Sequence, residues 1–224
     1  MKTYSSEEIK NIAVVGGAGC GKTTLTESIL LDSGIIKRRG SVGGKNTVSD
    51  TAAVEQEYGY SVYSTVCSVE RKSKKINFFD CPGSDDFSGQ AVTAINVTDA
   101  SAVVMNGQYG VEVGTINNFR LVQKYKKPVF FVVNNVDNDK CEYDNIAEQI
   151  HSTLGVKAYP VQFPTNSGDG FNSVIDVLSM KQYTFGADGE EPKVSDIASQ
   201  FVDKAKSLRD ALMEAAAEND ESLM

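Results

Sequence analysis

A glycine-rich stretch near the start of the chain, residues 16–23, constrains the fold more than any other feature. It matches the pattern G-x-x-x-x-G-K-[ST] and directly follows an apolar run, residues 12–15, that is typical of a buried strand. Glycines let the backbone fold around a phosphate group, so that N–H groups and a helix N-terminus point at it. Residues 24–31 continue with helical spacing. The order of strand, loop and helix therefore predicts a phosphate-binding loop rather than an ordinary glycine-rich turn.

Two side chains at the end of this stretch carry its chemistry. Lys22 is expected to reach the β- and γ-phosphates of a nucleotide as a point charge, and the Thr23 hydroxyl can ligate the Mg²⁺ that bridges them. The residues expected to surround the phosphates are Gly16, Gly17, Ala18, Gly19, Cys20, Gly21, Lys22, Thr23 and Thr24.

Charge and cysteine spacing exclude several classes of function. The chain has 224 residues and a net charge of −8, which argues against broad binding to a phosphate backbone, so we expect no DNA partner and only local contacts with RNA. Its four cysteines are widely spaced and suggest neither a zinc site nor a disulfide framework, which fits a reducing cytoplasm. No apolar run approaches the roughly 20 residues of a membrane span, so no membrane partner is expected.

Strand-like and helix-like segments alternate along the chain. A polar stretch, residues 37–59, is long enough to be a functional loop. Two apolar runs, residues 102–105 and 129–133, are typical of central parallel strands covered on both faces. The other expected elements are a hairpin formed by residues 61–69 and 76–79, and helices around residues 90–97, 115–125 and 143–154. The pattern predicts an α/β fold with a doubly wound, mostly parallel sheet of the P-loop NTPase type.

A second motif follows the strand that ends at residue 79. Asp80, Cys81, Pro82 and Gly83 form an Asp-x-Pro-Gly sequence, which alone is more typical of an ordinary turn. Behind a phosphate-binding loop, Asp80 can hold Mg²⁺ through water and the Gly83 N–H can meet a γ-phosphate.

A third motif closes the strand of residues 129–133. It contains Asn134, Asn135 and Asp137, and its carboxylate could accept hydrogen bonds from guanine N1–H and N2–H₂. Adenine lacks this pair of donors, so Asp137 would select GTP over ATP.

These three motifs, in this order, resemble those of a translational GTPase, and elongation factor G is the most similar family. Residues 55–62 resemble the end of that family's first switch loop, residues 110–112 the turn after its fourth strand, and residues 206–224 a helix of its inserted subdomain. The resemblance implies a factor that binds GTP and GDP with Mg²⁺, docks on the ribosome and drives translocation of tRNA and mRNA. Relatives that protect, rescue or recycle ribosomes are an alternative.

The resemblance also assigns roles residue by residue. It implies that Thr23 and Ser61 supply hydroxyl ligands to Mg²⁺, with Asp80 acting on the same ion, and that Asp80 and Gly83 sense the γ-phosphate. Asn134 and Asp137 would hold the guanine.

Three departures from the family pattern affect the expected activity. Ser84 stands where the family has a histidine that orients the attacking water, and losing such a group typically costs about 10²–10³ in rate, so slow or absent hydrolysis is expected. Gly19 replaces a frequent aspartate of the phosphate-binding loop, so assistance from a monovalent cation is not expected. Asn135 replaces a lysine that packs on the base, which predicts weaker nucleotide affinity. The single histidine, His151, is expected on a helix surface.

The resemblance divides the chain into two domains. Residues 1–156 would form the GTPase core without its final strand and helix, and residues 157–224 an incomplete inserted subdomain, as in an N-terminal fragment. The strand of residues 129–133 would then have a free edge. A stripe formed by Ile197, Phe201, Ala205, Leu208, Leu212 and Ala215 is expected to be packing surface of a final helix.

Two functions of different classes stay open. One is a GTP hydrolase whose turnover depends on the ribosome, and the other is a GTP-dependent ribosome-binding switch whose hydrolysis is lost. Ser84 favours the second. An unrelated P-loop ATPase is a third and distant alternative, which tighter binding of ATP than of GTP would indicate.

Overall fold

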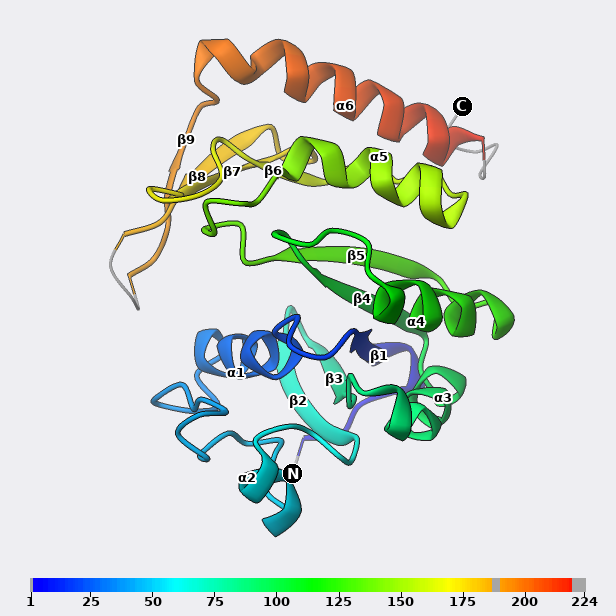
Figure 1. Cartoon of the computed structure of the whole chain (residues 1–224). Helices are drawn as coiled ribbons and strands as arrows, with labels where there is room; N and C mark the ends of the chain where they lie inside the picture. Colours follow the sequence, from blue (N-terminus) through cyan, green and yellow to red (C-terminus); the bar gives the residue numbers. More distant parts are fainter. Residues whose placement is uncertain (1, 187–189, 219–224) are drawn as a thin grey trace. The chain divides into compact units, whose positions relative to one another are not determined.

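The computed structural model describes residues 2–186 and 190–218 of the chain (Figure 1). The chain divides into two compact units, Met1–Asn134 and Asn135–Met224. Among the described residues, no helix is both long and apolar enough to cross a bilayer.

The first unit is built on one five-stranded sheet with the order β2-β3-β1-β4-β5. Strand β1 pairs in parallel with β3 and β4, and β4 pairs in parallel with β5, whereas β2 is antiparallel to β3. This confirms the predicted doubly wound, mostly parallel sheet. The strands are β1 Ile9–Gly16, β2 Thr65–Arg71, β3 Lys74–Asp80, β4 Ala100–Asn106 and β5 Val129–Asn134.

Helices cover both faces of this sheet. On one face, Ala91 and Ile95 of α3 and Val122 of α4 pack with Ala13 and Val103 of the central strands. On the other face, apolar residues of α1 pack against β2 and β3. The helices of this unit are η1 Ser6–Glu8, α1 Lys22–Asp32, α2 Ala53–Tyr58, η2 Asp85–Phe87, α3 Ser88–Val97 and α4 Val113–Lys124. The short helix α2 lies inside the stretch that the sequence predicts to be a loop.

The predicted hairpin is present, but its first strand begins later than expected. Strands β2 and β3 are joined through Lys72 and Ser73, both with positive φ, as in the two-residue turns that match strand twist. The prediction that residues 61–64 belong to the strand is wrong. The N–H groups of Val62 and Tyr63 donate to Glu55 and that of Ser64 donates to Gln90, so side chains take up the donors that a strand would need.

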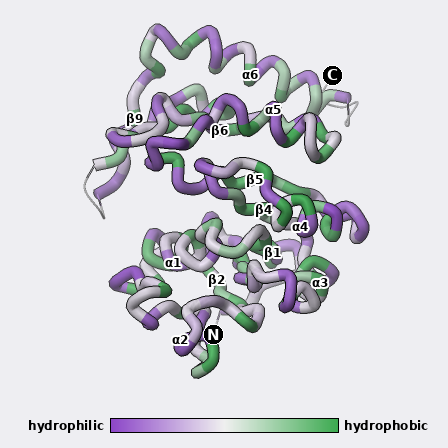
Figure 2. Tube along the Cα trace, in the orientation of Figure 1, coloured by the Kyte–Doolittle hydropathy of each residue, from purple (hydrophilic) through white to green (hydrophobic). Residues whose placement is uncertain are grey.

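The two apolar runs, both typical of central strands covered on both faces, differ in burial and in position within the sheet. Residues 101–105 of β4 are buried, and β4 appears as a hydrophobic segment in Figure 2. Strand β5 is at the edge of the sheet and only partly buried, with Phe130 44% exposed. In the part of the chain that the structure describes, no strand pairs with the outer edge of β5, as predicted.

The second unit combines two helices with an antiparallel sheet of order β6-β7-β8-β9. Its core contains Phe163, Ile175, Val177 and Ala205, packed against Ile197, Phe201 and Leu208. Phe201, Ala205 and Leu208 of the predicted stripe are therefore packing surface, and Ile197 packs there too although it precedes the helix. Leu212 and Ala215 are only partly buried, and the packing of this end of the stripe stays a prediction. His151 is exposed on α5. The elements are α5 Tyr143–Leu154, β6 Gln162–Pro164, β7 Ser173–Asp176, β8 Lys181–Thr184, β9 Lys193–Ser195 and α6 Ser199–Ala217.

The division into compact units differs from the domain boundary expected from the sequence. It falls between Asn134 and Asn135 rather than after residue 156, so α5 belongs to the second unit. The assignment of residues 1–156 and 157–224 to two functional domains stays a prediction. The last part of the segment 206–224, residues 219–224, lies outside the described residues.

Candidate functional site

The glycine-rich stretch forms a loop between β1 and α1, as predicted. Gly16 and Gly21 have φ values of 146° and 91°, which favour glycine. A Cβ built at Gly16 would collide with the Val104 carbonyl oxygen, so this position also has no space for a side chain. Helix α1 begins at Lys22, directly after Gly21. The loop thus ends at a helix N-terminus, which is favourable for anions.

Lys22 is held inside the loop. Its side chain is buried, and its ammonium group donates to the carbonyl oxygens of Gly16, at 3.1 Å, and Gly17, at 2.8 Å. These bonds keep a positive charge at the centre of the loop, where it can meet phosphate oxygens.

The two hydroxyls predicted to ligate Mg²⁺ lie next to each other. Thr23 is the second residue of α1 and Ser61 lies in the segment before β2, yet their side-chain hydroxyl oxygens are 3.4 Å apart. The fold therefore brings together two residues that are 38 positions apart in the sequence.

Asp80 ends β3 and is buried with a carboxylate that lacks partners. Neither of its oxygens makes a hydrogen bond within the described part of the chain. Burial raises its pKa to about 6, although the nearby hydroxyls of Ser49 and Thr23 and the Lys22 ammonium act in the opposite direction. A buried carboxylate without partners is costly, and a divalent cation beside it would remove that cost.

These groups fit a magnesium ion. One carboxylate and two hydroxyls leave further positions for water and phosphate oxygens, which Mg²⁺ commonly keeps. Within the described residues, no group of three or more His, Cys, Asp or Glu side chains is arranged to hold a metal ion. Hydroxyl, water and phosphate oxygens would therefore have to complete the coordination of Mg²⁺.

Asp50 is a further member of this region that the sequence analysis missed. It is buried, one of its carboxylate oxygens has no hydrogen-bond partner among the described residues, and burial raises its pKa. The Ser61 hydroxyl near it acts in the opposite direction. In the sequence, Asp50 is a single aspartate within the polar stretch 37–59 and belongs to no motif, so nothing there indicates its role.

Two buried glutamates hold the polar segment that follows α1. Glu27 of α1 accepts hydrogen bonds from the N–H groups of Gly40 and Val48. Glu55 of α2 accepts from Ala52 at 3.0 Å, Val62 at 3.0 Å and Tyr63 at 3.1 Å. The segment is therefore fixed from both sides, and Ser49, Asp50 and Ser61 are positioned as a result. Neither glutamate has a role that a sequence motif indicates.

The Asp-x-Pro-Gly sequence forms a turn against the phosphate-binding loop. A Cβ at Gly83 would collide with the Lys22 ammonium and would lie 2.7 Å from the Gly17 carbonyl oxygen. Glycine is therefore needed here by space, and Gly83 lies beside Lys22. Cys81 and Pro82 are buried behind the turn, and burial raises the pKa of the Cys81 thiol to about 12.

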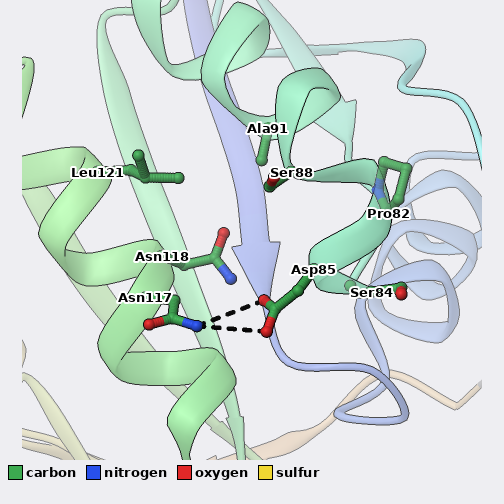
Figure 3. A pocket seen from close by; sticks show the side chains of 9 residues that line it. Pro82, Ser84, Asp85, Ser88, Ala91, Asn117, Asn118 and Leu121 are labelled. Atoms are coloured by element: carbon green, nitrogen blue, oxygen red, sulfur yellow. Dashed lines mark hydrogen bonds between the residues drawn. The ribbon is translucent and has the colours of Figure 1, made fainter.

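Ser84, at the position of the expected catalytic residue, points within its own turn. Its hydroxyl donates to Asp86 at 3.4 Å. Beside the turn is a small hollow between η2, α3 and α4, shown in Figure 3. Its lining includes Ser84, Asp85, Ser88, Asn117, Asn118 and Leu121.

The residues of the third motif fall into different units. Asn134 ends β5, and its amide donates to the Cys20 carbonyl oxygen at 3.0 Å, which ties the strand end to the phosphate-binding loop. Asn135 has a positive φ of 57°, and both Asn135 and Asp137 are exposed within the second unit. Their approach to a guanine base stays a prediction.

The thiols of the four cysteines are free and buried, and burial raises their pKa values, to about 11 for Cys67. A raised pKa keeps a thiol protonated and weakly nucleophilic.

Comparison with known proteins gives consistent matches over nearly the whole chain. A family described as the Elongation factor Tu GTP binding domain matches residues 7–218. Elongation factor G of Mycoplasma genitalium and that of Mycoplasma pneumoniae are each 32% identical over 224 residues, which is 100% of this chain and 33% of theirs. A crystal structure from Thermus thermophilus has a TM-score of 0.89 and 30% identity, and the match covers 96% of this chain and 32% of that one. The chain spans about a third of the length of these relatives.

Proposed function

Because this chain belongs to the family of elongation factor Tu GTP binding domains, we propose that it binds GTP and GDP with Mg²⁺ as the nucleotide switch of an elongation factor G-like translation factor. The observation that carries the proposal is the buried Asp80 carboxylate without partners, close to the Thr23 hydroxyl, which is paired with that of Ser61. A phosphate-binding loop with such a set of oxygen ligands suits a nucleotide and its metal ion.

Each of these groups has a distinct role in the proposal. Lys22 neutralises charge on the β- and γ-phosphates, and the N–H groups of residues 16–21 surround the phosphate oxygens. The Gly83 N–H meets the γ-phosphate, so GTP and GDP affect its turn differently. Thr23, Ser61 and Asp80 hold Mg²⁺, which, when bound, stabilises negative charge on the phosphoryl group that is transferred.

Base selection is assigned to the exposed carboxylate of Asp137. It would accept two hydrogen bonds from guanine, while Asn134 braces the phosphate-binding loop through Cys20. The test is Asp137→Asn, with binding of GTP, ATP and xanthosine triphosphate measured by calorimetry. The amide NH₂ of asparagine would face the amino group of guanine, which is also a donor, so no hydrogen bond forms. Xanthine has a carbonyl oxygen at the same position, which accepts a hydrogen bond from the amide. We expect GTP binding to weaken and xanthosine triphosphate binding to strengthen. Wild-type preference for ATP would contradict the proposal.

The biological role proposed for the protein follows its relatives. We propose that it acts on the ribosome in the cytoplasm, through local contacts with ribosomal RNA and proteins, and supports translocation of tRNA and mRNA. A role in ribosome protection, rescue or recycling is the alternative, and translocation assays with purified ribosomes distinguish the two.

The arrangement at Ser84 favours a second candidate, a switch that binds GTP without rapid hydrolysis. A serine hydroxyl directed at Asp86 is shorter than an imidazole and less able to orient an attacking water. The test measures GTP hydrolysis with ribosomes for the wild type and for Ser84→His, with Ser88→His as a matched exposed control. The switch is supported if the wild type binds GTP without hydrolysing it and if Ser84→His, but not Ser88→His, hydrolyses GTP. Ribosome-stimulated turnover of the wild type contradicts it and supports a GTP hydrolase.

A further inference from the structure

Gly114, in the first turn of α4, makes the closest approach to the phosphate-binding loop among the described glycines of the helices. A Cβ built on Gly114 would lie 2.6 Å from the Cα and 3.3 Å from the N of Gly17. A Cβ built on Gly17 would instead lie 3.8 Å from the Gly114 Cα, an ordinary contact distance. The φ of Gly114 is not positive, so its backbone conformation does not require glycine. Only the contact with the loop requires it.

The same loop residue is contacted from another direction by the Asp-x-Pro-Gly turn. A Cβ at Gly83 would lie 2.7 Å from the Gly17 carbonyl oxygen and 2.8 Å from the Ala18 Cα. Gly17 is therefore in close contact with both Gly83 and Gly114. Because closely packed groups cannot absorb extra volume, a shift of α4 displaces the loop, and the loop displaces the turn.

The next turn of α4 is tied to the residues after Gly83. The Asn117 amide donates to both carboxylate oxygens of Asp85, at 3.4 and 3.3 Å (Figure 3). The Asn118 amide donates to the Gly114 carbonyl oxygen at 2.8 Å, which holds the first turn of the helix. Helix α4 thus contacts the phosphate-binding loop through Gly114 and the turn through Asn117.

We infer that Gly114 is a positioning residue for nucleotide binding, because it sets the distance between α4 and the phosphate-binding loop. Through Gly17 it also sets the position of the Gly83 N–H. This inference rests on the proposed function, in which the loop binds the phosphates and Gly83 meets the γ-phosphate. A side chain at position 114 is expected to weaken binding of both nucleotides, and of GTP more than GDP, since only GTP carries the γ-phosphate.

The test compares two glycines at the same helix position. Gly89 is the second residue of α3, as Gly114 is of α4, but a Cβ at Gly89 would meet nothing within 4 Å. For Gly114→Ala we expect the Kd for GDP to rise roughly tenfold and that for GTP to rise more, because extra volume at a close contact forces a displacement. For Gly89→Ala both Kd values should stay within about twofold of the wild type. Equal affinities in the two variants would overturn the inference.

A second variant and a second measurement keep the test decisive. If Gly114→Ala does not fold, Asn118→Ala takes its place in the test. This variant adds no volume and removes the hydrogen bond to the Gly114 carbonyl oxygen, so it should weaken GTP binding by about threefold. An unchanged affinity would count against the inference. Hydrogen exchange of the amides of residues 16–21 without nucleotide should be faster in Gly114→Ala than in Gly89→Ala. If the wild type binds no nucleotide, the proposed function fails, but this exchange difference still decides whether Gly114 positions the loop.

Discussion

Carboxylates are buried both beside the segment after α1 and at the end of β3, but their hydrogen bonding differs. Glu27 and Glu55 are buried and accept hydrogen bonds from backbone N–H groups of the segment they hold. Asp80 is buried to a similar degree, yet neither of its oxygens has a partner among the described residues.

This difference separates buried charge that maintains structure from buried charge that is available to a ligand. A carboxylate that accepts several N–H bonds is stabilised by charge-assisted hydrogen bonds, and its removal leaves those donors unpaired. A carboxylate without partners destabilises the folded chain until a cation neutralises it. Glu55 and Asp80 should therefore respond to neutralisation with opposite signs.

The largest effect is expected for Glu55→Gln. The amide would place a donor among the N–H groups of Ala52, Val62 and Tyr63, and we expect the free energy of unfolding to fall by about 2–3 kcal/mol. Urea denaturation measures this. Glu57→Gln, an exposed position of the same helix, is the control and should change stability by less than about 0.5 kcal/mol. Equal losses in the two variants would contradict the assignment of Glu55 as a structural acceptor.

The opposite sign is expected for Asp80→Asn in the absence of nucleotide and Mg²⁺. Because the pKa of Asp80 is raised to about 6 from 3.8, its ionised form destabilises the fold at pH 7.5, and neutralisation should raise the free energy of unfolding by about 1–2 kcal/mol. The same denaturation experiment, with chelator present, gives the value. With GTP and Mg²⁺ added, the wild type should gain more stability than the variant. If Asp80→Asn is less stable than the wild type without ligand, the Asp80 carboxylate stabilises the fold, as those of Glu27 and Glu55 do, and the distinction between these carboxylates is wrong.

The pH dependence of this difference sharpens the comparison. A folded-state pKa above the unfolded value means that the folded chain binds the proton more tightly, so its stability rises as the pH falls from above 6 towards 3.8. The difference in free energy of unfolding between Asp80→Asn and the wild type should therefore be largest above about pH 7, decrease around pH 6 and approach zero near pH 4. Denaturation of both proteins across this range measures the difference. A difference independent of pH would show that ionisation of Asp80 is not its cause.

The smallest effect is expected for Ser61→Ala. Loss of one of the paired hydroxyls should raise the Mg²⁺ concentration that half-saturates GTP binding by about threefold, with little change in stability. Titration of Mg²⁺ against a fluorescent GTP analogue measures this. Ser61→Thr keeps the hydroxyl and should behave as the wild type, whereas equal behaviour of Ser61→Ala and the wild type would remove Ser61 from the proposed ligand set.

The fold class and the family could be predicted from short, contiguous stretches of the sequence. Fixed spacing at residues 16–23, an apolar strand before it and two further motifs at strand ends were enough to predict the doubly wound sheet. They also predicted the resemblance to elongation factor G, which the matches over the whole chain confirm. These features are local, since each motif is contiguous and belongs to one strand end. Element types follow from local periodicity for the same reason.

The resemblance implied that Thr23 and Ser61 ligate one ion and that β5 has a free edge, but the contacts and the strand order that produce both belong to the tertiary structure. The pairing of Thr23 with Ser61, and the separation of β4 from β5 into a buried strand and an edge strand, depend on strand order and not on composition. Likewise, the residue type of Asp80 or Glu55 does not predict whether its carboxylate accepts hydrogen bonds. That outcome depends on where backbone N–H groups from elsewhere in the chain come to lie. The physical reason is that hydrogen bonding and desolvation of a buried charge are set by its neighbours in space, which local patterns do not contain.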